Sequence, residues 1–213
     1  LRCLAGLQKH QGQVVLEGQE LHLIPARQRA QRISWLAQSD GGSALDDLRV
    51  QDIVLLGRLP HQGLLATAQA ADAAAVAQAL EAARCQHLQD RLFGQLSGGE
   101  RQKALLARAL AVGASGLVVD EPLASLDPGH QIDVMELLAR EARRGALVVV
   151  VLHDLNLAST FADDVIMLKA GRVLASGPVE KTVTPENVAE VFDLEADIFS
   201  RQGRLICVPR LER

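Results

Sequence analysis

Hydrophobic and polar residues follow two different periods along the chain. Short apolar runs at 116–122 and 146–153, the second rich in β-branched residues, are typical of strands buried in a parallel sheet. Segments beginning at Ser97 and Gln131 instead place apolar residues at helical spacing, which predicts helices. The helix expected over 131–143 lies between the two strands and would cross over the sheet. This alternation predicts an α/β fold.

Shorter signals predict the remaining elements. The N-terminal LRCLAGL reads as the tail of a helix that Gly6 stops, and Arg27–Arg32 reads as a solvated basic face. Thr184 followed by Pro185 marks the start of a helix. The other expected elements are an extended segment at 12–20 with a turn at Glu17-Gly18, a strand at 33–36, a hairpin at 165–175 and a last strand at 204–209.

The composition changes between residues 45 and 96, which are rich in alanine and favour helix. Val76, Leu80 and Ala83 form a narrow apolar stripe there, and Asp72 falls among the polar positions. We therefore expect a single domain over 1–213, in which an α/β core (1–44 and 97–213) carries an inserted helical subdomain (45–96).

Composition narrows the function classes. Hydrophobic residues make up 48% of the 213-residue chain, enough for a sizeable core, and the longest apolar run is far shorter than a membrane span. The net charge of −4 gives no reason to expect nucleic-acid binding. The cysteines, Cys3, Cys85 and Cys207, are odd in number and lack C-x-x-C spacing, which argues against a disulfide framework or a zinc site and fits a reducing compartment.

The sequence LSGGERQ at 96–102 carries the first candidate chemistry. Ser97 and Glu100 have the spacing of a capping box, so an ordinary capped helix explains them. Gly98 and Gly99 are costly in a first helical turn, but they let a phosphate approach bare backbone N–H groups at the positive end of the helix dipole. Both interpretations remain open from this stretch alone.

Polar residues follow the two predicted buried strands. Asp120 and Glu121 come at the end of the first, and His153 comes at the end of the second. Because open α/β sheets bind ligands at the carboxyl ends of their strands, we expect these three side chains around one crevice. His61 has no second ligand at metal spacing, so we interpret it as a surface or interface histidine.

The order of LSGGE, LVVDEP at 117–122, SLD at 125–127 and His153 resembles the ATP-binding subunits of ABC transporters. The resemblance implies an ABC ATPase core of the P-loop NTPase type, with a mixed, mainly parallel sheet and flanking helices. LSGGE would be the signature motif, LVVDEP the Walker B strand, SLD the D-loop and His153 the switch histidine. It also makes Gln38, which follows the strand at 33–36, the expected Q-loop glutamine.

The resemblance further implies ATP and Mg²⁺ as ligands and assigns a role to each residue. Asp120 and Gln38 would hold the Mg²⁺ shell, partly through water, and Glu121 with His153 would carry out catalysis. Asp127 would link two ATP sites across a homodimer. The signature residues would bind the γ-phosphate of the ATP on the opposing subunit; they are Ser97, Gly98, Gly99 and Glu100.

Two segments, VQDIVLLGRLPH at 50–61 and TPENVAEVF at 184–192, resemble importers of iron–siderophore, haem or cobalamin complexes. The implied partners are transmembrane permease subunits and, indirectly, a substrate-binding protein, with no nucleic acid. The implied location is peripheral, on the cytoplasmic face of the inner membrane.

The family's Walker A motif, G-x-x-x-x-G-K-[ST], does not occur in the sequence. We expect the N-terminal strands and P-loop to be missing from this chain, and the 213 residues alone to be an inactive fragment of an ATPase. A non-catalytic interaction protein is the main alternative. A chromosome-maintenance or repair ATPase would carry long coiled coils between the Q-loop and the signature, and this interval has no sustained heptads.

Overall fold

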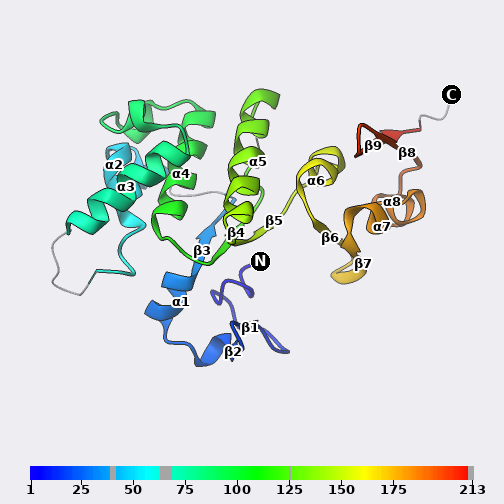
Figure 1. The fold of residues 1–213 in the computed structure, drawn as a ribbon, viewed down its shortest axis with the longest axis horizontal. Helices are drawn as coiled ribbons and strands as arrows, with labels where there is room; N and C mark the ends of the chain where they lie inside the picture. The colour runs from blue at the N-terminus through cyan, green and yellow to red at the C-terminus, as the bar shows by residue number, and fades with distance from the viewer. Residues whose placement is uncertain (39–41, 63–68, 125, 211–213) are drawn as a thin grey trace. The chain divides into compact units, whose positions relative to one another are not determined.

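The computed structural model describes residues 1–38, 42–62, 69–124 and 126–210. Ser125, in the expected D-loop, lies outside the described residues. The chain divides into two compact units, Leu1–Val151 and Leu152–Arg213, each described by itself below (Figure 1).

A parallel sheet forms the centre of the first unit. Its strands are β3 (Ile33–Leu36), β4 (Gly116–Val119) and β5 (Leu147–Val150), in the order β3-β4-β5. Every residue of β4 is buried, as the apolar run predicts. The expectation of a buried strand at 146–153 is only partly correct: β5 lies at one edge of these three strands and is half-buried, with Leu147 64% exposed.

Helices α4 (Gly98–Ala111) and α5 (Pro128–Arg143) confirm the helical spacing read from the sequence. Helix α5 begins three residues earlier than expected because Asp127 caps it and Pro128 occupies its first position. Its buried face includes Met135 and Leu138, whereas Ile132 is 40% exposed.

The segment between β3 and α4 is helical, as its composition predicts. It contains α2 (Val50–Leu56), α3 (Ala70–Ala82) and short 3-10 turns at Gly42–Leu45 (η2), Gln86–Leu88 (η3) and Phe93–Gln95 (η4). Helices α2 and α3 both contact α4. Asp72 was placed on the polar face of α3, and this was wrong, because its carboxylate is buried in an ion pair with Arg58. The subdomain boundaries remain a prediction.

The N-terminal residues confirm two local signals. Gly6 has φ +68°, Leu7 N donates to Arg2 O and Gly6 N donates to Cys3 O, which is the Schellman pattern of a helix end. Strands β1 (Val15–Leu16) and β2 (Gln19–Glu20) pair through the expected turn, followed by η1 (Leu21–Leu23). The basic segment forms helix α1 (Ala26–Arg32), which has no buried residue, so the expected solvated face before the strand is confirmed.

The second unit has its own core around Met167, Val188 and Cys207. The predicted hairpin, the Thr184-capped helix and the last strand are all present as β6 with β7, α8 and β9. Strand β8, which pairs with β9, was not predicted. The elements are α6 (Leu155–Phe161), β6 (Asp164–Lys169), β7 (Arg172–Pro178), α7 (Val179–Thr182), α8 (Pro185–Phe192), β8 (Ala196–Arg201) and β9 (Arg204–Pro209).

The three cysteines are free thiols. In the part of the chain that the structure describes, none of the helices combines the length and the apolar character that a membrane span requires.

Candidate functional site

Gln38, Asp120 and Glu121 lie together at the carboxyl edge of the sheet. The backbone N–H of Asp120 donates to the carbonyl oxygen of Leu36 at 2.9 Å, which continues the pairing of β3 with β4 by one step. One residue later, Nε2 of Gln38 donates to Oε2 of Glu121 at 2.6 Å. Two residues 83 positions apart in the sequence therefore meet because their strands are parallel neighbours.

The backbone of Glu121 adopts a left-handed conformation, with φ +46°. This region is unfavourable for a residue with a Cβ atom and costs on the order of 1–3 kcal/mol. Strain of this kind concentrates at functional sites, where the surrounding structure holds it in place. Here it occurs at the residue that accepts the Gln38 hydrogen bond.

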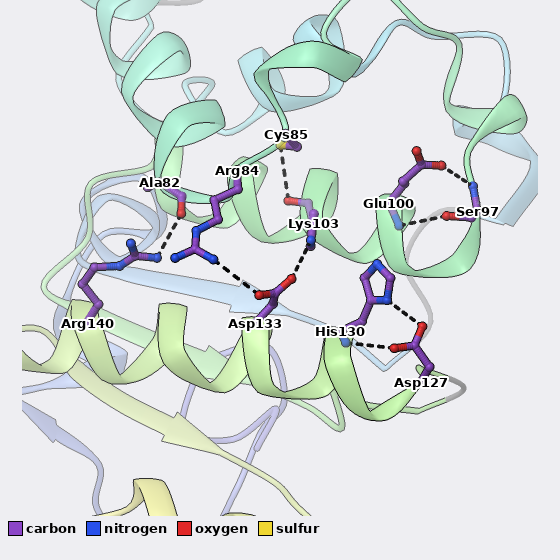
Figure 2. Close-up of polar contacts among 10 residues, drawn as sticks. All are labelled: Ala82, Arg84, Cys85, Ser97, Glu100, Lys103, Asp127, His130, Asp133 and Arg140. Atoms are coloured by element: carbon purple, nitrogen blue, oxygen red, sulfur yellow. Dashed lines mark hydrogen bonds and ion pairs between the residues drawn. The ribbon is translucent and has the colours of Figure 1, made fainter.

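The LSGGE stretch forms a complete capping box (Figure 2). Ser97 N donates to the Glu100 carboxylate at 2.8 Å, and Glu100 N donates to Ser97 Oγ at 3.4 Å. The backbone N–H of Ser97 is the main cause that holds the pKa of Glu100 below its usual range. The cap uses the N–H of Glu100, so the N–H groups of Gly98 and Gly99 remain at the positive end of the helix dipole.

The first helical turn of α4 is open on one side and closely packed on the other. Apart from its chain neighbours and the backbone of its own helix, no atom of the described residues lies within 4 Å of a Cβ built on Gly98. A Cβ on Gly99 would lie 2.7 Å from Cδ2 and 3.0 Å from Nε2 of His130, on α5. The capped-helix interpretation is therefore correct, and it leaves room for an anion at the same turn.

Asp127 lies on the neighbouring helix and is joined to the same histidine. Its Oδ1 accepts the backbone N–H of His130 at 3.1 Å, and its Oδ2 lies 2.6 Å from Nδ1 of the ring. These bonds, the backbone bond foremost, lower the pKa of Asp127. The sequence interpretation missed His130, although its position three residues after an N-cap aspartate is a recognisable signal.

His153 lies in the second unit, three residues after the end of β5. It is exposed and precedes Asp154, whose side chain caps α6 by accepting from the N–H groups of Asn156 and Leu157. The grouping of His153 with Asp120 and Glu121 around one crevice stays a prediction.

Within the described residues, no group of three His, Cys, Asp or Glu side chains could hold a metal ion. The oxygen ligands available near Asp120 nevertheless fit Mg²⁺, which usually takes one or two carboxylates from the protein and completes its shell with water and phosphate oxygens. His61 is exposed, and its Nε2 lies 2.7 Å from the carbonyl oxygen of Val112.

The opposite end of α4 is held by residues that sequence reasoning did not single out. Arg58 donates to the Ala111 carbonyl at 2.8 Å and to the Asp72 carboxylate at 2.9 Å. A Cβ on Gly57 would lie only 2.2 Å from the carbonyl oxygen of Arg108, so α2 approaches α4 as closely as backbone allows. The VQDIVLLGRLPH segment thus fixes the C-terminal end of the helix that begins with the signature.

Comparison with known proteins finds similar sequences over most of the chain. The family described as "ABC transporter" matches residues 1–124. The chain is 45% identical over 195 residues to the hemin import ATP-binding protein HmuV of Pseudomonas fluorescens, which covers 89% of this chain and 74% of that protein.

Two solved structures extend the similarity to the fold. One is described as a metal-chelate type ABC transporter in an inward-facing conformation; it has a TM-score of 0.76 and 28% identity and covers 85% of this chain and 73% of that chain. The other is the dimeric structure of MJ0796, a bacterial ABC transporter cassette, with a TM-score of 0.70 and 25% identity over 84% of this chain and 78% of that chain.

Proposed function

The chain belongs to the ABC transporter family, and we propose on that basis that it is the ATP-binding and ATP-hydrolysing subunit of an importer for haem or a similar metal chelate. The observation that carries the catalytic part is the 2.6 Å hydrogen bond from Gln38 to Glu121, beside Asp120, at the ends of two adjacent parallel strands. The HmuV similarity and the metal-chelate transporter support the choice of substrate class.

The reaction is the transfer of the γ-phosphoryl group of ATP to water. Glu121 orients the water and accepts its proton while oxygen attacks the γ-phosphorus and the bond to the β-phosphate oxygen breaks. Gln38 restricts the Glu121 carboxylate by donating to Oε2. The side chain of Glu121 therefore loses less orientational entropy when the transition state forms. His153 contacts the γ-phosphate in this proposal, a role that rests on the resemblance.

Asp120 and the amide oxygen of Gln38 would hold Mg²⁺, partly through water. Such an ion neutralises charge on the β- and γ-phosphate oxygens when bound. The hydrogen bond from the Asp120 N–H to Leu36 fixes the backbone of Asp120 at the sheet edge, next to Glu121 in the sequence, without depending on the ion.

Two copies of the subunit act together in this proposal. The first turn of α4 supplies Ser97, Gly98 and Gly99 to the γ-phosphate of the ATP bound by the partner, and Glu100 keeps that turn capped. Asp127 links the two sites. The dimeric cassette MJ0796 supports a dimer, and the HmuV similarity supports work beside transmembrane permease subunits at the cytoplasmic side of the membrane.

Replacing Glu121 tests the catalytic assignment. In the full-length protein, Glu121→Gln keeps the side-chain shape but cannot accept the proton, so hydrolysis should fall about 10²-fold or more. ATP binding should remain, and ATP should trap a dimer that is visible by size-exclusion chromatography. Phosphate release is the measurement. Turnover equal to that of the wild type would remove Glu121 as the base.

Growth tests the substrate class. A strain lacking the gene should lose growth on haem as sole iron source, and the wild-type gene should restore it while Glu121→Gln should not. Parallel cultures on a ferric siderophore, and on cobalamin where it limits growth, distinguish the related substrates. Normal growth and uptake on all of these, in a strain with no redundant transporter, would contradict the importer assignment.

A further inference from the structure

We propose that His130 is a positioning residue for ATP hydrolysis, which holds the signature turn (Ser97–Glu100) and Asp127 in fixed relation to each other. The inference rests on the proposed function, because that function gives both elements a task at the nucleotide. It starts from one side chain that contacts both of them, and Figure 2 shows its hydrogen bonds to Asp127.

The first contact is with the signature turn. The Cδ2–Nε2 edge of the ring lies against Gly99 so closely that a methyl group there would overlap it, with 2.7 Å to Cδ2. Gly99 therefore has a second use besides exposing backbone to phosphate: it makes room for the ring. An aspartate at position 99 would displace His130 as well as repel a phosphate, so Gly99→Asp cannot separate the two effects.

The second contact is with Asp127. The carboxylate accepts hydrogen bonds, and its lowered pKa keeps it ionised at neutral pH. The ring nitrogen Nδ1, 2.6 Å from Oδ2, must therefore carry a proton and donate it. The backbone N–H of His130 holds the other oxygen at 3.1 Å, so the carboxylate is fixed at both ends.

A third contact joins the two helices one helical turn further along α5. Asp133 accepts from Nζ of Lys103 on α4 at 2.8 Å and pairs with Arg84 at 3.5 Å. His130 and Asp133 are three residues apart and lie on the same face of α5. With α4 and α5 held there, the ring of His130 sets the distance between Gly99 and Asp127.

A stability measurement tests the contact without using activity. Alanine is favoured over glycine in a helix, so Gly99→Ala should raise the melting temperature wherever space allows. With His130 present we expect Gly99→Ala to lower the melting temperature, and in the His130→Ala background we expect it to raise it. If Gly99→Ala changed the melting temperature in the same direction in both backgrounds, the packing of His130 against Gly99 would be wrong and the proposal would be overturned.

Activity of the full-length protein tests the positioning. His130→Ala keeps the backbone cap of α5 but loses the ring, and kcat should fall by about tenfold to 100-fold, with ATP binding to the isolated subunit unchanged. His130→Asn can still donate to Asp127 near the place of Nδ1 and should stay within about threefold of wild type. His130→Phe keeps the volume but not the donor and should remain defective.

The matched control is His22→Ala. His22 also places Nδ1 near a carboxylate, 3.2 Å from Glu20, but its side chain is 66% exposed, so kcat should not change. If His130→Phe restored kcat and His130→Asn did not, His130 would act only by filling space, and the proposal would be overturned. Wild-type turnover in His130→Ala would also overturn it. Absence of Glu121-dependent hydrolysis in the wild type would instead overturn the proposed function, and the proposal with it.

Discussion

At the scale of single residues, Gly57 shows how one missing side chain sets a helix crossing. Its φ of −61° is ordinary for a helix, so conformation does not require glycine. The requirement is steric, because a Cβ would lie 2.2 Å from the Arg108 carbonyl oxygen and 3.1 Å from Cβ of Ala111. The nearest atom belongs to the backbone and cannot rotate away.

Gly57→Ala should therefore force α2 and α4 apart and lower the free energy of unfolding by about 1–3 kcal/mol. Equilibrium denaturation in urea is the measurement. Gly98→Ala is the control, since that position is helical and open, and alanine there should be neutral or stabilising by up to about 1 kcal/mol. If the two variants were equally stable, the close approach of α2 to α4 would be wrong.

At the scale of elements, the N-terminus of α4 combines a cap with a proposed phosphate contact. Both use the same few atoms, so a single substitution at Ser97 affects stability and function together. Comparing alanine with aspartate at position 97 separates the cap from the phosphate contact, because aspartate is as good an N-cap as serine but carries a negative charge.

Ser97→Ala should lower the free energy of unfolding by about 1 kcal/mol through loss of the cap. Ser97→Asp should keep that stability yet abolish ATP-driven dimer formation in a Glu121→Gln background, because its charge opposes the γ-phosphate. Thermal denaturation and size-exclusion chromatography give the two readouts. Normal dimer formation by Ser97→Asp would place the phosphate elsewhere.

Local signals explain which elements the sequence predicts well. Ser97 with Glu100, Thr184 with Pro185 and the turn at Glu17-Gly18 act within a few residues, and each is found in the structure. Gln38 and Glu121 each follow a predicted strand, but only the resemblance to a family singled out Gln38, and their hydrogen bond was not predicted.

Long-range contacts explain what the sequence did not reveal. Asp72 was expected to face solvent on α3, because no local sequence pattern indicates its ion pair with Arg58. His130 and Gly57 act through atoms of other helices, so their roles depend on a packing that periodicity cannot supply. Strand β8 carries charged residues that hid its pairing with β9.

At the scale of the whole molecule, six carboxyl groups have a pKa below the usual range. Hydrogen bonds and ion pairs lower the pKa of groups in both units: Asp72, Glu100, Asp127, Asp133, Glu186 and Asp197. A lowered pKa in the folded state stabilises the fold at pH values above the pKa of the unfolded chain, and this stabilisation is lost as the pH falls toward the folded value. Stability should therefore decline in acid, below about pH 4.

Asp72→Asn tests this dependence at the buried pair. The backbone N–H of Gln69 and then Arg58 are the main causes of the lowered pKa of Asp72, and the amide removes the charge that both favour. The variant should be less stable than wild type at pH 7, and the difference should shrink as the pH falls from about 5 toward 3. Urea denaturation across that range measures it. A gap that stays constant or widens in acid would contradict the assigned shift.

The C-terminal end of helix α4 is held by hydrogen bonds to its last carbonyl oxygens. Arg58 and His61 bind the carbonyl oxygens of Ala111 and Val112, and the hydroxyl of Ser34 on β3 donates to that of Ala109. The described contacts at the signature turn are made by side chains and include the ring of His130 and the ion pair of Glu100 with Arg91 at 3.4 Å. When a helix is fixed at one end, a small change in its tilt moves the other end by a distance that grows with the helix length. With 14 residues, α4 is about 21 Å long, so a tilt of about 5° around the fixed end moves Ser97 by about 2 Å. That displacement is enough to make or break a hydrogen bond to phosphate, so a small rotation can act as an on–off step.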